Sequence, residues 1–189
     1  GRVNYNYKSK YYIQANFRYD GSGRFKKGNR WGFFPSVSAG WVLTQEKFME
    51  GARGVLSFLK LRASYGQLGN DRIGNYPYQS TLSSNDPVGY IGSASQVQAL
   101  QGFSAYQMVL DNITWETTET YDVGIDANFF SDRLRITADY YKKTTRDMLI
   151  LVDIPSYLGY TAPYKNSGDM NAKGWDLSVA WSDHIGDDF

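Results

Sequence analysis

Four carboxylates lie close together along the chain: Glu116, Glu119, Asp122 and Asp126. A glycosidase needs two such groups about 5 to 10 Å apart on either side of a sugar. On a β-strand, Asp122 and Asp126 share one face but lie about 13 Å apart, because the rise is about 3.3 Å per residue. We therefore predict solvated charges on a polar face here, and no catalytic residue.

Other residues that could do chemistry have little support from their neighbours. His184 is the only histidine and lies in a predicted turn beside Asp183, which supports neither a zinc site nor a Ser-His-Asp triad. The glycines at 21–23 and 66–69 are not followed by a helix that could present its N-terminus to phosphate. The chain has no cysteine, which excludes thiolate zinc sites and disulfides. We predict no cofactor and no metal site.

Aromatic side chains are the unusual part of the composition of this 189-residue chain. The 16 Tyr, 10 Phe and 5 Trp make up 16% of the residues, and such rings suit boundaries between dry and wet surroundings. The 20 Lys and Arg nearly balance the 19 Asp and Glu, which gives no reason to expect nucleic acid as a partner. No apolar run approaches the roughly 20 residues of a membrane-spanning helix, but a membrane strand needs apolar residues only at alternate positions.

Alternation of apolar and polar residues is the strongest pattern in the sequence. From Tyr121 to Phe129 the odd positions are aromatic or aliphatic and the even positions are polar or Gly. This pattern is typical of a strand with one apolar face and one solvated face. The same pattern predicts seven strands, at 2–7, 11–20, 34–44, 59–67, 117–130, 133–145 and 172–182. Several reach about ten residues, which is longer than most soluble strands and close to the length of a tilted membrane strand.

Short turns fix how neighbouring strands align. A two-residue loop at Ser131 and Asp132 brings apolar residues opposite apolar ones, and a slip of one residue would place each of them opposite a polar one. A three-residue turn at 8–10 does the same for the first hairpin, although it lacks the usual Gly. The expected pairs are Phe129 with Leu134, Ala127 with Ile136, Ile125 with Ala138, Val123 with Tyr140, Tyr5 with Ile13 and Val3 with Ala15.

Connections alternate in length along the chain. Short ones are expected at 8–10, 131–132 and 183–188, a middling one at 45–58 with a helical turn around 46–49, and long ones at 21–32, 68–116 and 146–171. Tight turns at one end, long loops at the other and aromatic residues near both ends are typical of outer-membrane barrels. The predicted fold class is all-β, part of an antiparallel up-and-down transmembrane β-barrel. A soluble β-sandwich is the alternative.

Several short phrases occur in a fixed order: RYDGSGRF at 18–25, Trp31, FPS at 34–36, Gly40-Trp41, LKLRASYGQLGN at 59–70, WE at 115–116, DVGID at 122–126, DYYKKTT at 139–145, NSG at 166–168 and Gly174. In this order they resemble the SusC/RagA-type TonB-linked outer-membrane receptors, over essentially the whole chain. The phrase at 59–70 is the most specific match.

The resemblance implies a piece from the later part of a barrel of about 22 strands that imports oligosaccharides or peptides across the bacterial cell outer membrane. It also implies a SusD-like surface lipoprotein as partner, and energy from the TonB-ExbB-ExbD system through an N-terminal part. We expect 1–189 to be a fragment of one receptor β-barrel domain, without the plug and N-terminal domains. Its first and last strands would be bare edges.

Aromatic residues in the long loops are the best candidates for contact with substrate or the lipoprotein, because flat rings stack on sugars and peptides. Packing of each ring against the barrel or a partner is the equal alternative. The candidates are Tyr76, Tyr78, Tyr90, Phe103, Tyr106, Tyr157, Tyr160 and Tyr164. We expect binding and transport, not catalysis. The rival functions are a soluble β-sandwich glycan-binding module and a carbohydrate-active enzyme domain.

Overall fold

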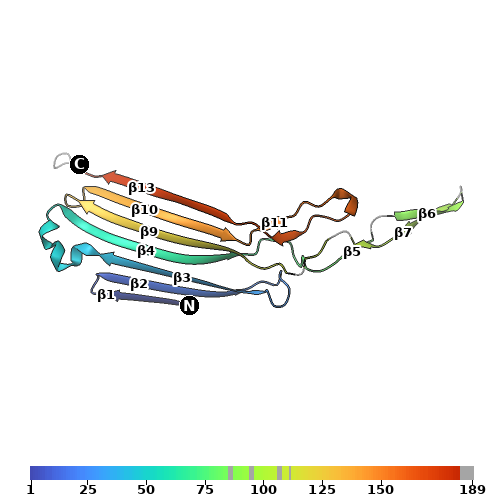
Figure 1. Cartoon of the computed structure of the whole chain (residues 1–189), viewed down its shortest axis with the longest axis horizontal. Coiled ribbons are helices and arrows are strands. Elements are labelled where there is room, and N and C mark those ends of the chain that lie inside the picture. Colours follow the sequence, from blue (N-terminus) through green and yellow to red (C-terminus); the bar gives the residue numbers. More distant parts are fainter. Residues whose placement is uncertain (85–86, 94–95, 106–107, 111, 184–189) are drawn as a thin grey trace.

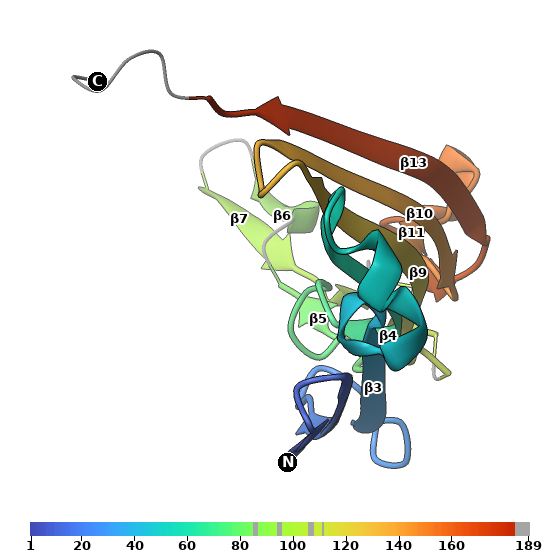
Figure 2. The same ribbon diagram turned by 90° about the vertical axis from the view of Figure 1, so that its left-hand side faces the viewer.

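A computed structural model describes residues 1–84, 87–93, 96–105, 108–110 and 112–183. It contains a seven-stranded antiparallel sheet with the order β1-β2-β3-β4-β9-β10-β13 (Figure 1). The strands of this sheet are β1 (Arg2–Tyr7), β2 (Tyr11–Gly21), β3 (Trp31–Val42), β4 (Leu56–Asn70), β9 (Glu116–Phe129), β10 (Leu134–Arg146) and β13 (Met170–Trp181). Seen from one end the sheet is curved, and its edge strands β1 and β13 are not paired with each other (Figure 2). It is therefore an open part of a barrel wall.

All seven predicted strands are present, with small shifts of their bounds. The largest differences are at β3, which begins at Trp31 and not at residue 34, and at β4, which extends beyond the predicted 59–67 at both ends. Pairing with a neighbouring strand causes these extensions, since Gly21 lies opposite Trp31 and Asn70 lies opposite Glu116. On β3 the added residues Trp31 and Phe33 continue the exposed apolar positions of the strand. On β4 the register shifts between Leu56 and Phe58, so the alternation is interrupted there.

The predicted hairpin registers are confirmed. Phe129 lies opposite Leu134, Val3 lies opposite Ala15, and the other four predicted pairs are also present. Because side chains alternate between faces with a period of two residues, each register keeps the apolar residues of both strands on one face.

Tight turns join strands at one end of the sheet. Lys8, Ser9, Ser131 and Asp132 have positive φ values, of 52, 55, 57 and 69°. Such backbone belongs to the primed hairpin turns that usually contain Gly. Each non-Gly residue costs about 1 to 2 kcal/mol in this region, so the pairing of the long strands must hold these turns in place.

The middling connection and the chain end complete this side of the sheet. Two 3-10 helices, η1 (Leu43–Gln45) and η2 (Lys47–Ala52), lie between β3 and β4, which agrees with the helical turn predicted around 46–49. None of the helices in the described part of the chain is long and apolar enough to cross a membrane. The turn predicted at 183–188 lies, after Asp183, outside the described residues, as does His184.

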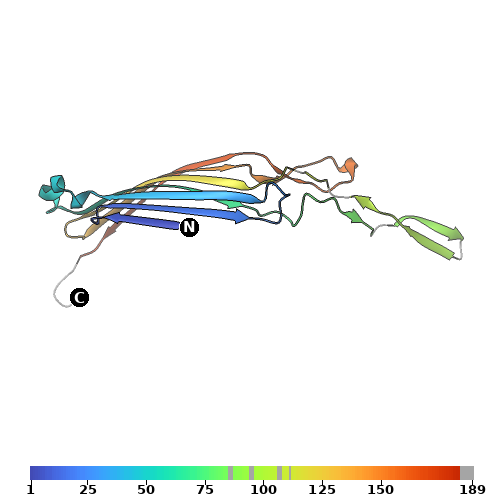
Figure 3. The same cartoon turned by 90° about the horizontal axis from the view of Figure 1, so that it is seen from below.

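The long loops extend from the opposite end of the sheet (Figures 1 and 3). They contain the short elements β5 (Leu82–Ser83), β6 (Pro87–Ser93), β7 (Gln96–Gln101), β8 (Ser104–Ala105), β11 (Leu149–Leu151), η3 (Ser156–Leu158) and β12 (Tyr164–Asn166). The β6/β7 hairpin reaches farthest from the sheet (Figure 3). The predicted division into a short-turn end and a long-loop end is therefore confirmed.

The two faces of the sheet differ in chemistry. On one face the aliphatic residues Val123, Leu177 and Val179 are 60, 57 and 60% exposed. A β-sandwich buries such a face beneath a second sheet, and in the part of the chain that the structure describes no second layer covers it. The opposite face carries polar residues and ion pairs. This arrangement supports a membrane wall and not the sandwich.

Candidate functional site

A small hydrophobic core lies at the base of the long loops. Phe25, Ile73 and Ile113 are at most 6% exposed and contact one another, and Trp115 packs against them. The ring centroid of Trp115 lies 5.3 Å from that of Phe25 and 5.3 Å from that of Phe34 on β3. Burying each of these large side chains contributes about 1.5 to 3 kcal/mol. We call Phe25, Ile73, Ile113 and Trp115 the loop-base cluster.

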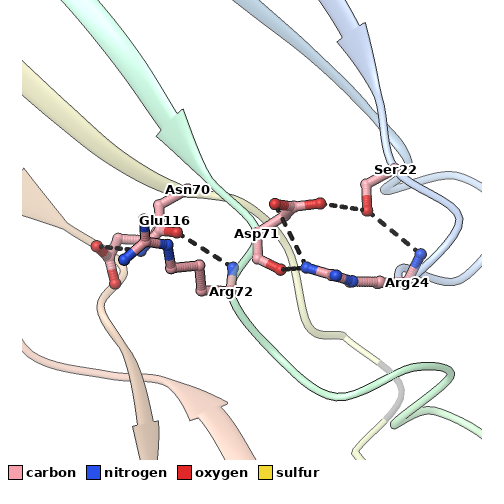
Figure 4. A network of polar contacts seen from close by, with 6 residues as sticks. All are labelled: Ser22, Arg24, Asn70, Asp71, Arg72 and Glu116. Carbon is pink, nitrogen blue, oxygen red and sulfur yellow. Dashed lines mark hydrogen bonds and ion pairs between the residues drawn. The ribbon is translucent and has the colours of Figure 1, made fainter.

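Asp71, directly after β4, connects two of the loops at this base (Figure 4). The Ser22 hydroxyl donates to Asp71 Oδ2 at 2.8 Å, and Arg24 Nη1 donates to the Asp71 carbonyl oxygen at 2.9 Å. Arg24 Nη1 also lies 3.7 Å from Asp71 Oδ1. Loop 22–30 is thereby fixed to the beginning of loop 71–115.

Glu116, at the other end of loop 71–115, connects three segments. Asn70 Nδ2 donates to Glu116 Oε1 at 3.0 Å (Figure 4). The backbone N–H of Leu149, from loop 147–169, donates to Glu116 Oε2 at 3.0 Å. Both carboxylate oxygens therefore accept hydrogen bonds, and this residue has a structural role.

Asn166 completes the connection between the last two loops. Its Oδ1 accepts from the backbone N–H of Thr114 at 2.8 Å, and its Nδ2 donates to the carbonyl oxygens of Thr114 at 2.9 Å and Asp147 at 2.8 Å. Asp71, Glu116 and Asn166 together fasten all three long loops into one platform above the sheet.

The polar face of the sheet is centred on Arg62. Its Nη2 lies 2.8 Å from Asp139 Oδ2 and its Nε lies 3.2 Å from Asp126 Oδ2. The hydroxyl of Thr137 donates to Asp126 Oδ1 at 3.2 Å. Gly124 lies between these side chains, opposite both Arg62 and Asp139 in the register. We call this face, with Arg62, Asp126 and Asp139 at its centre, the polar wall.

The polar wall is hollowed next to Arg62. A hollow of about 490 Å³ is lined by side chains of mixed charge and by amides, among them Asn4, Asn6, Gln14, Lys60, Arg62 and Asp122. Mixed charge and amide groups can exchange hydrogen bonds with a hydrated solute without selecting one sign of charge. Among the described residues no group of His, Cys, Asp or Glu could hold a metal ion.

Aromatic residues of the apolar face gather at the short-turn end. The rings of Tyr7, Tyr11 and Trp41 stack in a row, with centroids 6.4 and 6.2 Å apart. Glu46 accepts hydrogen bonds from the Tyr11 hydroxyl at 2.7 Å, from Lys10 Nζ at 3.1 Å and from Trp41 Nε1 at 3.3 Å. These bonds, that of Tyr11 first, lower the pKa of Glu46 below its usual value of 4.5. Aromatic rings with a polar edge at the short-turn end of the sheet suit the boundary between membrane and water.

The predicted loop aromatics that the structure describes lie in several separate places. Tyr76 and Tyr78 contact edge to face at a centroid distance of 6.2 Å, and Tyr164 packs against the loop-base cluster. Tyr106 lies outside the described residues. The other rings are well exposed and lie on separate parts of the loops: Tyr90 on β6, Phe103 between β7 and β8, Tyr157 on η3 and Tyr160 beyond it. Whether any of them contacts a substrate stays a prediction.

Three of the four predicted carboxylates have structural partners, and the fourth, Asp122, lines the hollow of the polar wall. Asp126 pairs with Arg62, Glu116 holds the loop base, and Glu119 accepts from Gln67 Nε2 at 3.1 Å. Sequence reasoning missed the central role of Arg62 and the pairing of Asp139. The signal that could have found them was Gly124, which both strand registers place opposite these two residues.

A curved antiparallel sheet with an apolar face, a polar face and long loops at one end defines a segment of the wall of a membrane β-barrel. The chain belongs to the TonB dependent receptor-like β-barrel family, whose profile matches residues 1–188. It is similar to TonB-dependent receptor P39 of Formosa agariphila, with 38% identity over 179 residues, which are 95% of this chain and 16% of that protein. It is also similar to TonB-dependent receptor SusC of Bacteroides thetaiotaomicron, with 33% identity over 181 residues, 95% of this chain and 18% of SusC.

Solved structures show the same arrangement. The RagAB peptide importer in its closed-closed state matches with a TM-score of 0.83 and 32% identity, over 99% of this chain and 20% of that one. The siderophore receptor PirA of Pseudomonas aeruginosa matches with a TM-score of 0.58 at 15% identity, which shows a common fold alone. The chain spans less than a fifth of the length of the curated relatives that it matches. The predicted family and fold class, a SusC/RagA-like partial barrel, are confirmed.

Proposed function

We propose that this chain forms part of the barrel wall of a TonB-dependent receptor that imports oligosaccharides or peptides across the outer membrane. One observation carries the proposal: a single sheet presents exposed aliphatic residues such as Val179 on one face and the polar wall on the other. Strands with this division suit lipid outside and an aqueous lumen inside. The likeness to SusC and to the RagAB peptide importer supports import as the activity.

The polar wall would line the path of the solute. The charges at its centre are paired, as in Arg62 with Asp126 and Asp139, so a solute that passes there meets hydrogen-bonding groups and little unbalanced charge. Energy would come from the TonB-ExbB-ExbD system through an N-terminal part of the receptor. Residues 1–189 would all belong to one barrel domain, and the plug to another part of the protein.

The loop platform would face the outside of the cell, since long loops of outer-membrane barrels are extracellular. We propose that it meets a SusD-like surface lipoprotein and the incoming solute. The exposed rings of Tyr90, Phe103 and Tyr157 are the best placed for stacking. Tyr164 is better explained by packing, because it lies against the loop-base cluster.

Transport is favoured over catalysis by the state of two of the candidate carboxylates, Glu116 and Asp126. Asp126 is held by Arg62 and Thr137, and both oxygens of Glu116 accept hydrogen bonds. A general acid and a nucleophile both need a free oxygen directed at the sugar. These residues are engaged in holding the wall and the loops.

The orientation of the wall can be tested with neighbouring cysteines, because the chain has none of its own. In the full-length receptor in its membrane, Ser178→Cys should react with a water-soluble maleimide. Val179→Cys should react only with a lipid-soluble one. If Val179→Cys were shielded from both reagents beneath protein, or if both positions reacted equally with the water-soluble reagent, the barrel wall would be excluded.

Import can be tested in the cell that carries the receptor. Deletion of its gene should abolish uptake of a labelled oligosaccharide or peptide, and the wild-type gene should restore it. Deletion of the TonB gene should have the same effect as deletion of the receptor gene. Unchanged uptake of both solute classes after receptor deletion would contradict the proposal.

A further inference from the structure

Towards the long-loop end of β10 and β13, the residues of the outward, apolar face change from apolar to aromatic and then to charged. Tyr140 and Trp175 lie opposite each other on this face and are 54 and 74% exposed. Two residues nearer to the long loops on each strand, and on the same face, Lys142 lies opposite Lys173. Aromatic residues of this kind mark the level of the lipid headgroups, so the two lysines lie at the headgroups or just above them.

Lys142 and Lys173 have the same charge and are direct neighbours across the strands. Such a pair is unfavourable unless an anion lies nearby. Within the part of the chain that the structure describes, no carboxylate lies within ion-pairing distance of either ammonium group. The acidic group next along this face, Glu119, is engaged by Gln67 and by Arg146, at 3.1 and 3.8 Å.

Several other cations of the sheet have a carboxylate partner within the chain. Lys10 lies 3.1 Å from Glu46, and Arg133 lies 3.5 Å from Asp183. At the long-loop end, Arg18 lies 2.6 Å from Asp20 and Arg146 lies 3.8 Å from Glu119. Lys142 and Lys173 differ from these cations, because they lie side by side and have no carboxylate partner among the described residues. Their anion is therefore expected to come from outside the protein.

We propose that Lys142 and Lys173 bind the phosphate of a glycolipid in the outer leaflet of the membrane. The inference rests on the proposed function, since it requires this face to contact lipid. Phosphate is the anion that membrane lipids carry at headgroup depth, and an ammonium group binds it as a point charge. Thr144 and Asn171, which are hydrogen-bonded to each other at 2.8 Å, extend the polar surface above the lysines. The rings of Tyr140 and Trp175 lie below the lysines, towards the hydrocarbon side of the headgroups.

The test uses the full-length receptor in nanodiscs of neutral phospholipid, with lipid A as the probe. A Lys142→Gln and Lys173→Gln double variant should bind phosphorylated lipid A about 25-fold more weakly than the wild type, at about fivefold for each lysine. Lys143→Gln is the matched control, because Lys143 is adjacent on β10 but lies on the polar wall. It should bind as the wild type does. Replacing both lysines by Arg should preserve binding.

A second measurement needs no variant. Wild-type receptor should bind lipid A whose phosphates have been removed as weakly as the double variant binds the intact lipid. Equal binding of intact and dephosphorylated lipid A would overturn the inference and leave the import proposal standing. So would equal binding by the double variant and the Lys143→Gln control. A receptor that stays soluble and monomeric without detergent would overturn both.

Discussion

Asp139 occupies the space beside Gly124 that any larger residue would need. The two residues lie opposite each other across β9 and β10, and a Cβ atom on Gly124 would collide with Asp139 Oδ1 and come within 3.0 Å of the guanidinium of Arg62. A glycine in the middle of a strand weakens the strand, but here it lets a cation on β4 reach an anion on β10. The ion pair at the centre of the polar wall depends on this missing side chain.

Gly124→Ala should therefore destabilise the receptor by about 1 to 3 kcal/mol, the usual cost of overpacking a well-fitted site. The measurement is the thermal midpoint of unfolding in detergent, and the gel-mobility shift of the folded barrel is its readout. Gly23→Ala is the control, because a Cβ atom there meets nothing within 4 Å. Equal midpoints for the two variants would contradict the packing described around Gly124.

Removal of the cation should destabilise the receptor more than removal of one anion. Arg62→Gln leaves Asp126 and Asp139 facing each other without a counter-charge, whereas Asp139→Asn leaves the Arg62 and Asp126 pair intact. The three side chains are about one-third exposed or less, so we expect roughly 1 to 3 kcal/mol for Arg62→Gln, less than for a fully buried pair. Denaturant midpoints of the two single variants and the double variant measure the coupling. The prediction fails if Asp139→Asn is the more damaging change.

Stability should depend on Glu46 in acid. Because the hydrogen bond from Tyr11 lowers the pKa of Glu46 in the folded protein below 4.5, its contribution is present at pH values above 4.5. It is lost as the pH falls through the lowered value. Glu46→Gln should thus be less stable than the wild type at pH 7 and equally stable well below the folded pKa. The measurement is the thermal midpoint of both proteins across this pH range. A difference between the two midpoints that stays the same at all pH values would contradict the prediction.

Asn166 should control the opening of the loop platform. Asn166→Ala removes three hydrogen bonds to Thr114 and Asp147, each worth about 1 kcal/mol. Proteolysis of loops 71–115 and 147–169 in the folded receptor should accelerate by about 10-fold or more. Asn75→Ala serves as the comparison, since Asn75 is an exposed residue of the same platform. Equal cleavage rates for Asn166→Ala and Asn75→Ala would show that the three hydrogen bonds do not hold the loops.

Loop rings that contact the solute should affect affinity without affecting folding. Tyr157 is 85% exposed on η3, and Tyr157→Ala should raise the concentration of solute that gives half-maximal uptake by about 5- to 150-fold, the range expected for the loss of one stacking contact worth about 1 to 3 kcal/mol. Tyr164→Ala should instead lower the thermal midpoint, because Tyr164 packs against the loop-base cluster. If Tyr157→Ala leaves uptake unchanged, the ring does not contact the solute.

The sequence by itself determined the strands and the face on which each residue lies. A strand has a period of two, so Val123 and Ile125 must share a face wherever the strand lies in space. Short turns carry the same information across a hairpin, which is why the pairing of Val123 with Tyr140 follows from the position of Ser131 and Asp132. These features depend on residues that are near one another along the chain.

Only the tertiary structure decided which distant side chains meet. Arg62 reaches Asp139 across an intervening strand because β4 pairs with β9 on the far side of a long loop and Gly124 leaves the path open. Phe25, Ile73 and Ile113 lie in irregular segments that have no periodic pattern, and they form a core only because the two loops that carry them close over the same end of the sheet. Contacts of this kind depend on the curvature of the sheet and on side-chain packing, which local periodicity does not encode.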